Sequence, residues 1–390
     1  MKIENIKVQN GEAEIDRRVE GLENSAKKER DHMGINVRFT DEDWARIERD
    51  WTAFWAGELD RPLVVMTGFE PDGELPEVPP FVPSLPMSMP AEEVVDRYGK
   101  HLEAQRFYGD AFPKWFVNFG PGIMAGFLGS KVGAAPDTVW FDPPEGASAH
   151  RLDPRYDPQN VWWQRVRDIT RCAAEAWQDR VCVSITDLGG NLDVAASLLS
   201  TEQLLTDLHD APEQIDRVVG KITGLWMRYY DELYDIVRRT GRGSTPWAPI
   251  WSPGKCYMLQ SDFAYMISPA MFERFVMPDL RACCEFLDHG FYHLDGKGQL
   301  PHLDMLLEME NLWGVQWIPG DGNPPADRWP AVLRRIRDAG KLCQMYVDAE
   351  GARRIVREIG GKGFIFQVGW DGLSRADAEG FLATLMRDSR

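Results

Sequence analysis

The feature that most constrains the fold is a repeated alternation of short apolar runs with stretches of helical periodicity, most regular after residue 160. Each apolar run has the length of a β-strand. Strands separated by helices predict a parallel sheet, because a parallel pair needs a long crossover connection. Eight such units predict an α/β fold of the (β/α)8 TIM-barrel type. The runs are centred near residues 64, 117, 183, 248, 292, 316, 344 and 365.

The pattern divides the chain into an N-terminal helical or irregular extension, residues 1–60, and a barrel, residues 61–390. Within the extension, Trp44, Trp51 and Trp55 recur at helical spacing. Such a stripe is typical of one packing face of a helix, because aromatic rings bury large apolar areas. We expect this face to cover the barrel or to bind a second copy of the chain, which leaves a homodimer open.

Composition narrows the function classes. The formal charge of −17 and the pI near 4.9 argue against a nucleic-acid surface and against binding to anionic lipid. Six cysteines without a CxxC pair fit a reducing cytoplasm. The charged opening residues do not resemble a secretory signal, and no apolar run is long enough to span a membrane. Walker A, GxGxxG and GxSxG motifs are also absent from the sequence.

A candidate site lies at the end of the fifth predicted strand. His293 and Asp295 stand two residues apart, so on an extended strand both side chains point to the same face. Gly296 and Gly298 follow and allow a tight turn. An imidazole beside a carboxylate can hold a metal or share a proton. The alternative is a core histidine with a carboxylate that caps the turn.

The barrel architecture nominates further residues, because chemistry in such barrels occurs at the carboxyl ends of the strands. We expect Asp187 to act with His293 and Asp295, although it could also form only an Asx turn. Asp348 is better explained as a helix N-cap. The expected mouth is acidic and aromatic, which suits a metal, a cation or a neutral molecule. The expected substrate-binding residues are Asn191, Trp251, Lys297, Gln316, Tyr346, Gln367 and Trp370.

Five segments from Asp187 onward carry a family resemblance: Thr186–Asp193, Asp210–Glu213, Ile267–Leu280, Tyr292–Gly296 and Gln316–Gly320. With them the sequence resembles the uroporphyrinogen decarboxylase superfamily, which implies a (β/α)8 barrel. The arginine-rich signature of the true decarboxylases and their histidine near the last strand are not seen. The cobalamin-dependent methyltransferase branch has a zinc site of the form His-x-Cys, with a further cysteine after the last strand.

At the ligand positions of that branch this chain has His293, Asp295 and Asp371. The resemblance therefore implies a divalent metal, with zinc suspected, and a corrinoid carried by a partner protein. One nitrogen and two oxygens can bind zinc or a harder divalent cation. Loss of the soft thiolates puts activation of a thiol acceptor in doubt.

Three functions stay open. The first is a metal-assisted methyltransferase that works with a corrinoid protein on a small substrate. The second is a metal-independent decarboxylase or lyase with a non-porphyrin substrate, in which Asp187 or Asp295 transfers a proton beside His293. The third is a barrel that binds a ligand or partner without catalysis.

Overall fold

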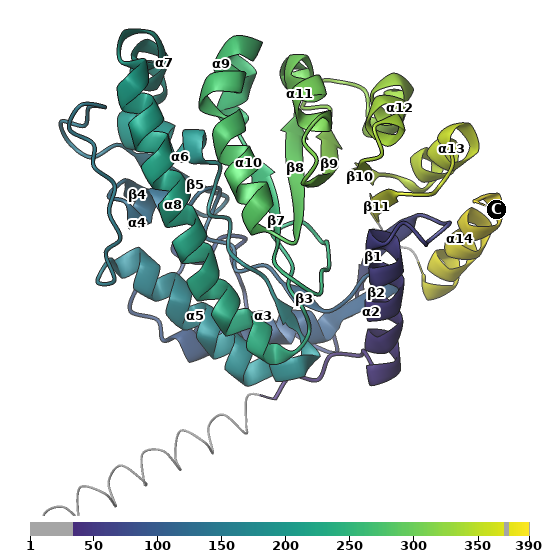
Figure 1. Ribbon diagram of the computed structural model, residues 1–390. Coiled ribbons are helices and arrows are strands. Elements are labelled where there is room, and N and C mark those ends of the chain that lie inside the picture. The colour runs from purple at the N-terminus through teal and green to yellow at the C-terminus, as the bar shows by residue number, and fades with distance from the viewer. Residues whose placement is uncertain (1–33, 370–373, 390) are drawn as a thin grey trace, which may run out of the picture.

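The computed structural model describes residues 34–369 and 374–389 (Figure 1). It has a mixed α/β fold around a central sheet of seven strands in the order β2-β1-β11-β10-β9-β8-β7. All neighbouring pairs are parallel except β1 with β2. The predicted α/β class and parallel pairing are therefore confirmed. The strands are β1 (Leu63–Phe69), β2 (Gln105–Gly109), β7 (Cys256–Gln260), β8 (His289–Asp295), β9 (Leu312–Ile318), β10 (Leu342–Val347) and β11 (Phe364–Val368).

Two smaller sheets accompany the central one. Strands β3 (Lys114–Trp115) and β6 (Cys182–Val183) form a parallel pair. Strands β4 (Lys131–Ala135) and β5 (Thr138–Asp142) form an antiparallel hairpin.

The predicted strand at residues 246–251 is wrong. This segment is irregular, and the next strand of the sheet is β7, residues 256–260, which is buried throughout. Pro246 and Pro249 interrupt the earlier run, and proline cannot donate a hydrogen bond to a sheet. The run of β7 has no proline, and it pairs in parallel with β8.

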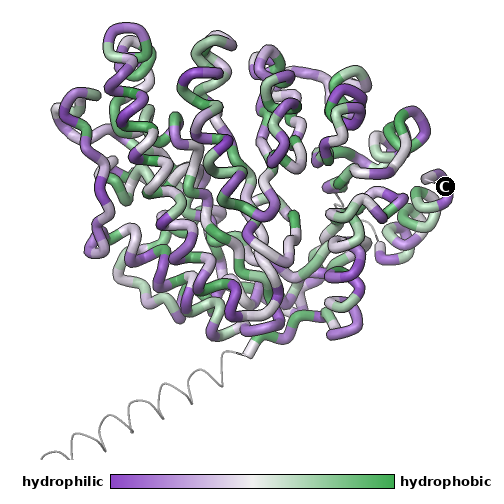
Figure 2. Tube along the Cα trace, in the orientation of Figure 1, coloured by the Kyte–Doolittle hydropathy of each residue, from purple (hydrophilic) through white to green (hydrophobic). Residues whose placement is uncertain are grey.

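Helices alternate with the strands and stand outside them in Figure 1. Figure 2 shows hydrophilic and apolar residues alternating along these helices, as expected for helices with one buried face. No helix in the described ranges has both the length and the apolar character needed to cross a membrane. The α-helices are α2 (Asp41–Trp55), α3 (Ala91–Ala104), α4 (Met124–Phe127), α5 (Val161–Trp177), α6 (Asn191–Leu199), α7 (Thr201–Asp210), α8 (Pro212–Val237), α9 (Pro269–Phe275), α10 (Met277–Phe286), α11 (Leu303–Leu307), α12 (Pro330–Asp338), α13 (Ala349–Ile359) and α14 (Arg375–Asp388).

The residues at the helix ends can be compared with the capping patterns in the sequence. Asp348 accepts a hydrogen bond from a backbone N–H of the first turn of α13, so the predicted N-cap is confirmed. Ser268, which stands before Pro269 as a cap followed by proline does, caps α9 in the same way. Asp210 and Glu213 have the spacing of a capping box, which would predict that Asp210 caps α8, and that prediction is wrong. Asp210 is the last residue of α7, and Ala211 occupies the N-cap of α8 without a side-chain bond.

The aromatic stripe of the extension packs on the core, as one of the two expectations held. Trp44, Trp51 and Trp55 of α2 are buried. The Trp55 ring stacks on His289, the first residue of β8, with 4.0 Å between centroids, and its Nε1 donates to the Trp251 carbonyl at 2.9 Å. Helix α2 thus lies at the amino end of β8, away from the carboxyl ends.

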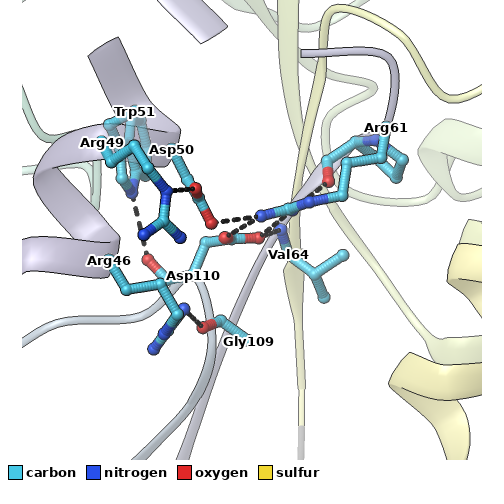
Figure 3. A network of polar contacts seen from close by, with 9 residues as sticks. Arg46, Arg49, Asp50, Trp51, Arg61, Val64, Gly109 and Asp110 are labelled. Carbon is cyan, nitrogen blue, oxygen red and sulfur yellow. Dashed lines mark hydrogen bonds and ion pairs between the residues drawn. The ribbon is translucent and has the colours of Figure 1, made fainter. Parts of the chain in front are cut away.

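An ion pair ties α2 to the sheet (Figure 3). The Arg61 guanidinium donates to both carboxylate oxygens of Asp110 at 2.8 Å and to Asp50 of α2 at 2.9 Å. The buried Asp110 carboxylate also accepts from the backbone N–H of Val64 in β1 at 2.8 Å. Charge-assisted bonds of this two-pronged kind fix orientation as well as contributing energy.

Candidate functional site

A pocket of about 310 Å³ lies at the carboxyl ends of β7 and β8. Gln260 ends β7, and His293 lies two residues before the end of β8. Both side chains line the pocket, together with Asp187 and Asp262. Aromatic walls with a few polar groups are typical of small-molecule sites. The aromatic residues that line it are Phe81, Phe116 and Trp247.

Three candidate metal ligands converge beside this pocket, which Asp262 and His293 line, while Asp295 lines a second pocket. Asp262, His293 and Asp295 each offer one ligand atom, and the three atoms lie within 4.8 Å of one another. His293 Nε2 and Asp295 Oδ2 are 3.9 Å apart, which is too long for a hydrogen bond. Two ligand atoms that each lie about 2.0–2.2 Å from one ion are separated by up to about 4 Å. The spacing of these side chains therefore fits a shared cation once they move slightly closer together.

The ligand set differs in one residue from the set implied by the resemblance. Sequence reasoning missed Asp262, because it placed the preceding strand at residues 246–251 instead of β7. With β7 correctly placed, Asp262 stands two residues after the strand end, where site residues are expected. The predicted ligand Asp371 and the predicted substrate contact Trp370 lie outside the described residues.

The orientation of His293 is set by the neighbouring strand. His293 and Gln316 are register partners in β8 and β9, and Nδ1 of the imidazole contacts the Gln316 Oε1. An amide oxygen can only accept, so Nδ1 carries the proton and the lone pair lies on Nε2, the atom that faces Asp295. Outer hydrogen bonds of this kind commonly fix the tautomer of metal-binding histidines.

Asp262 is held by a second set of contacts. It begins the 3-10 turn η4 (Asp262–Met266), whose first backbone N–H groups donate to the Asp193 carboxylate at 3.0 and 2.8 Å. The Tyr265 ring of this turn covers Gly296 and Gly298. A side chain at Gly298 would come within 2.5 Å of that ring, so glycine there allows the two loops to meet.

The carboxylates of the site are poorly compensated by positive charge. Burial raises the pKa of Asp187 to about 7 and that of Asp193 to about 8. Burial also raises the pKa of Asp262, with a smaller lowering by His293 and a raising by Asp295. In the described ranges no Lys or Arg forms an ion pair with these four carboxylates. A bound divalent cation would offset their repulsion.

Asp187 both forms an Asx-type turn and lies at the pocket, the two interpretations that the sequence left open. Its Oδ1 accepts from the Gly189 backbone N–H at 2.8 Å, which makes the expected Asx-type turn. The same carboxylate also lines the pocket, and the Tyr257 hydroxyl donates to it at 3.2 Å. A carboxyl group that is protonated near neutral pH can act as an acid toward a ligand.

Lys114 is a residue of the site region that sequence reasoning did not nominate. Its buried Nζ donates to the carbonyls of Pro246, Trp247 and Ala248 at 2.7, 2.6 and 2.9 Å. These bonds hold the irregular segment in place and set Trp247 with its ring edge-on to His293, 5.2 Å between centroids. Burial lowers the pKa of Lys114 to about 7.

Other nominated residues lie near His293 or along the same strand ends. Gln316 is fully buried and touches His293. Tyr346 of β10 is 44% exposed, and Gln367 is its register partner in β11. Lys297 is exposed and makes no hydrogen bond or ion pair to any residue in the described ranges.

Asn191 and Trp251 are not brought to the pocket. The Asn191 amide is buried and donates to Thr223 of α8 at 3.1 Å, within a network between helices. The Trp251 indole donates to the Arg242 carbonyl at 2.8 Å, on the side of the sheet that α2 covers. The tryptophan at the pocket is instead Trp247, four residues earlier.

Comparison of the chain with protein-family models gives no match, and comparison with curated proteins gives none either. The resemblance to the uroporphyrinogen decarboxylase superfamily therefore stays a prediction that depends on the sequence motifs. All six cysteines are free, as expected from their spacing.

Proposed function

We propose that this protein is a metal-dependent enzyme that transfers a methyl group between a small substrate and a corrinoid carried by a partner protein. The observation that carries the metal-dependent part is the convergence of Asp262, His293 and Asp295, the first two of which line the pocket. The methyl group and the corrinoid come from the resemblance to the cobalamin-dependent branch of the uroporphyrinogen decarboxylase superfamily.

The donor set fits a divalent cation. One imidazole nitrogen and two carboxylate oxygens suit zinc or a harder ion such as Mn²⁺. His293 presents Nε2 because Gln316 occupies Nδ1, and Asp262 is fixed by Asp193. Asp371, which the resemblance implies as a ligand, is retained as a possible fourth ligand.

The residues around the triad have separate tasks in this proposal. When bound, the metal polarises a heteroatom of the substrate and makes it a better nucleophile or leaving group. Phe116 and Trp247 cover the substrate and exclude water. Asp187, whose pKa burial raises to about 7, gives or takes a proton at a polar atom of the substrate. Gln316 keeps the His293 imidazole in one tautomer.

We also propose that the strands close into a (β/α)8 barrel of β1, β3, β6, β7, β8, β9, β10 and β11. One backbone hydrogen bond supports closure beside β6. The Ile185 N–H, just after β6, donates to the Thr245 carbonyl of the segment that precedes β7 at 3.2 Å.

Elemental analysis of the purified protein tests the metal. We expect about one divalent ion per chain, and loss of that ion in His293→Ala, Asp262→Asn and Asp295→Asn. His150→Ala removes an exposed histidine elsewhere and serves as the matched control. A metal-free wild-type protein that also fails to take up Zn²⁺ or Mn²⁺ would overturn the proposal.

One observation favours the metal-independent lyase as a second candidate. Asp187 lines the pocket and has a pKa raised by burial to about 7, which suits general acid–base catalysis without a metal. In that case turnover persists in EDTA, falls as pH rises through about 7, and is lost in Asp187→Asn. Turnover abolished by EDTA excludes this candidate.

A further inference from the structure

The pocket that Asp262 and His293 line also has an aromatic part. Phe81, Phe116 and Trp247 line it, and in the described ranges none of these rings stacks on another of the three. The segments that carry the two phenylalanines are joined by Asn118, whose Nδ2 donates to the Pro80 carbonyl at 2.8 Å. Trp247 belongs to the irregular segment that Lys114 holds. The aromatic part of the pocket is therefore built into the fold before any ligand binds.

The charged groups of this pocket are acidic. Asp187 and Asp262 line it, and none of the described residues that line it is Lys or Arg. Lys114 is not among the lining residues, and its Nζ, 5.9 Å from the centroid of the Phe116 ring, is bonded to three backbone carbonyls. Apart from a bound metal, an anion would meet no positive group in this lining, whereas a cation would meet two carboxylates.

Gln260 adds a neutral polar group to the lining. It ends β7, two residues before Asp262, and its side chain is 6% exposed at the pocket. Within the described ranges its amide makes no hydrogen bond, although an amide can both donate and accept. A ligand in the pocket that carries a hydroxyl group can therefore bond to this amide without displacing a protein partner.

Aromatic rings beside carboxylates match a methylated ammonium ion. Ring faces attract a cation, and they offer no strong acceptor for an N–H group, so a cation without N–H groups loses least when it leaves water. We propose that the pocket holds its substrate by a methylated ammonium group, which lies against the three rings beside the Asp187 carboxylate. Gln260 bonds to a hydroxyl group of the same substrate. The inference rests on the proposed function in taking this pocket as the substrate site, and it adds the substrate class.

Choline, neohexanol and ethanolamine test the proposal. Neohexanol has carbon in place of the choline nitrogen, so it keeps the shape and loses the charge, while ethanolamine keeps the charge and loses the methyl groups. Binding to the full-length protein is measured by calorimetry or ligand-observed NMR at about 0.15 M salt, which screens the long-range field of the acidic chain. We expect choline to bind at least about tenfold more tightly than either analogue.

Variants that replace a ring by an aliphatic side chain place the ammonium group in the pocket. Trp247→Leu removes no side-chain hydrogen bond, because Nε1 has no partner within the described ranges. It should weaken choline binding at least about fivefold and leave neohexanol binding unchanged, whereas a general loss of structure would weaken both. Phe116→Leu should act in the same way. Trp313→Leu is the matched control: this residue lies near the amino end of β9 and is 38% exposed, so both affinities should stay unchanged.

Repeating the titrations in EDTA separates this proposal from the metal centre. Without a metal the Asp262 carboxylate is less compensated, so choline should bind at least as tightly as before and keep its preference. The proposal is overturned if the wild-type protein binds choline no more tightly than neohexanol or ethanolamine, or fails to bind it. It is also overturned if folded Trp247→Leu and Phe116→Leu keep the full preference for choline. If neither variant folds, the comparison of the three compounds on the wild-type protein still decides.

Discussion

The Gln316 side chain accepts a hydrogen bond from Nδ1 of His293, and it does so from the adjacent strand at the same register level. The amide thereby fixes both the tautomer and the ring direction of the histidine. His293 Nε2 is left free at the pocket, 3.9 Å from the Asp295 carboxylate. This pair makes β9 a part of the proposed metal site, although it provides no ligand.

Gln316→Leu should therefore weaken metal binding by about 10–100-fold while leaving all three ligands in place. Without the amide, the imidazole can rotate or change tautomer. Metal affinity is measured by competition with a coloured chelator, and Gln299→Leu controls for the general effect of removing a buried glutamine. Unchanged affinity in Gln316→Leu would show that the contact does not orient the ligand.

Gly298→Ala should lower metal affinity by moving η4. The added Cβ would come within 2.5 Å of the Tyr265 ring, which must shift and carry the turn with it. A steric conflict of this size typically costs about 1–3 kcal/mol of stability. The double variant Gly298→Ala with Tyr265→Ala removes the conflict, so it should regain metal binding. Failure of the double variant to recover would contradict the proposed link between the two loops.

Arg61→Met should destabilise the protein by about 3–5 kcal/mol, because it leaves the buried Asp110 carboxylate without its charge partner. Urea unfolding measures the loss. Arg61→Met with Asp110→Asn removes both charges and keeps an acceptor for the Val64 N–H, so it should be more stable than Arg61→Met alone. Equal stability of the two variants would show that the unpaired charge is not the cause.

We expect His289 to make the folded protein less stable as the pH becomes acidic. Burial lowers its pKa to about 4, so the folded state favours the neutral imidazole. The resulting stability is fully present above the ordinary pKa near 6.5 and is lost as pH falls from there toward 4. Because the ring is partly exposed, we expect an effect on the order of 1–2 kcal/mol.

Urea unfolding at pH 7.5 and pH 4.5 measures the His289 effect, with His289→Gln as the comparison. The wild-type protein should lose more stability between the two pH values than the variant does. A variant with the same pH dependence as the wild type would assign the loss to other groups.

The sequence predicted the later strands well because their apolar runs are bounded by polar or glycine residues. It also predicted that His293 and Asp295 face the same side, since this follows from the two-residue repeat of a strand. β7 was misplaced because residues 246–251 carry as many apolar side chains as a strand does. That one error hid Asp262 and favoured Trp251 over Trp247.

Other features depend on contacts between distant segments, which local patterns do not encode. Asn191 follows a strand end, as a site residue would, yet its amide is used by Thr223 of α8. The three carbonyls around Lys114 come from a segment more than 130 residues away. In neither case does the local sequence name the partner.

Anomalous diffraction from crystals soaked in Mn²⁺ or Zn²⁺ tests the central claim most directly. We expect one strong peak about 2.0–2.2 Å from His293 Nε2 and from carboxylate oxygens of Asp262 and Asp295. A peak at another site, or no peak at the pocket in fully soaked crystals, would contradict the proposed metal centre.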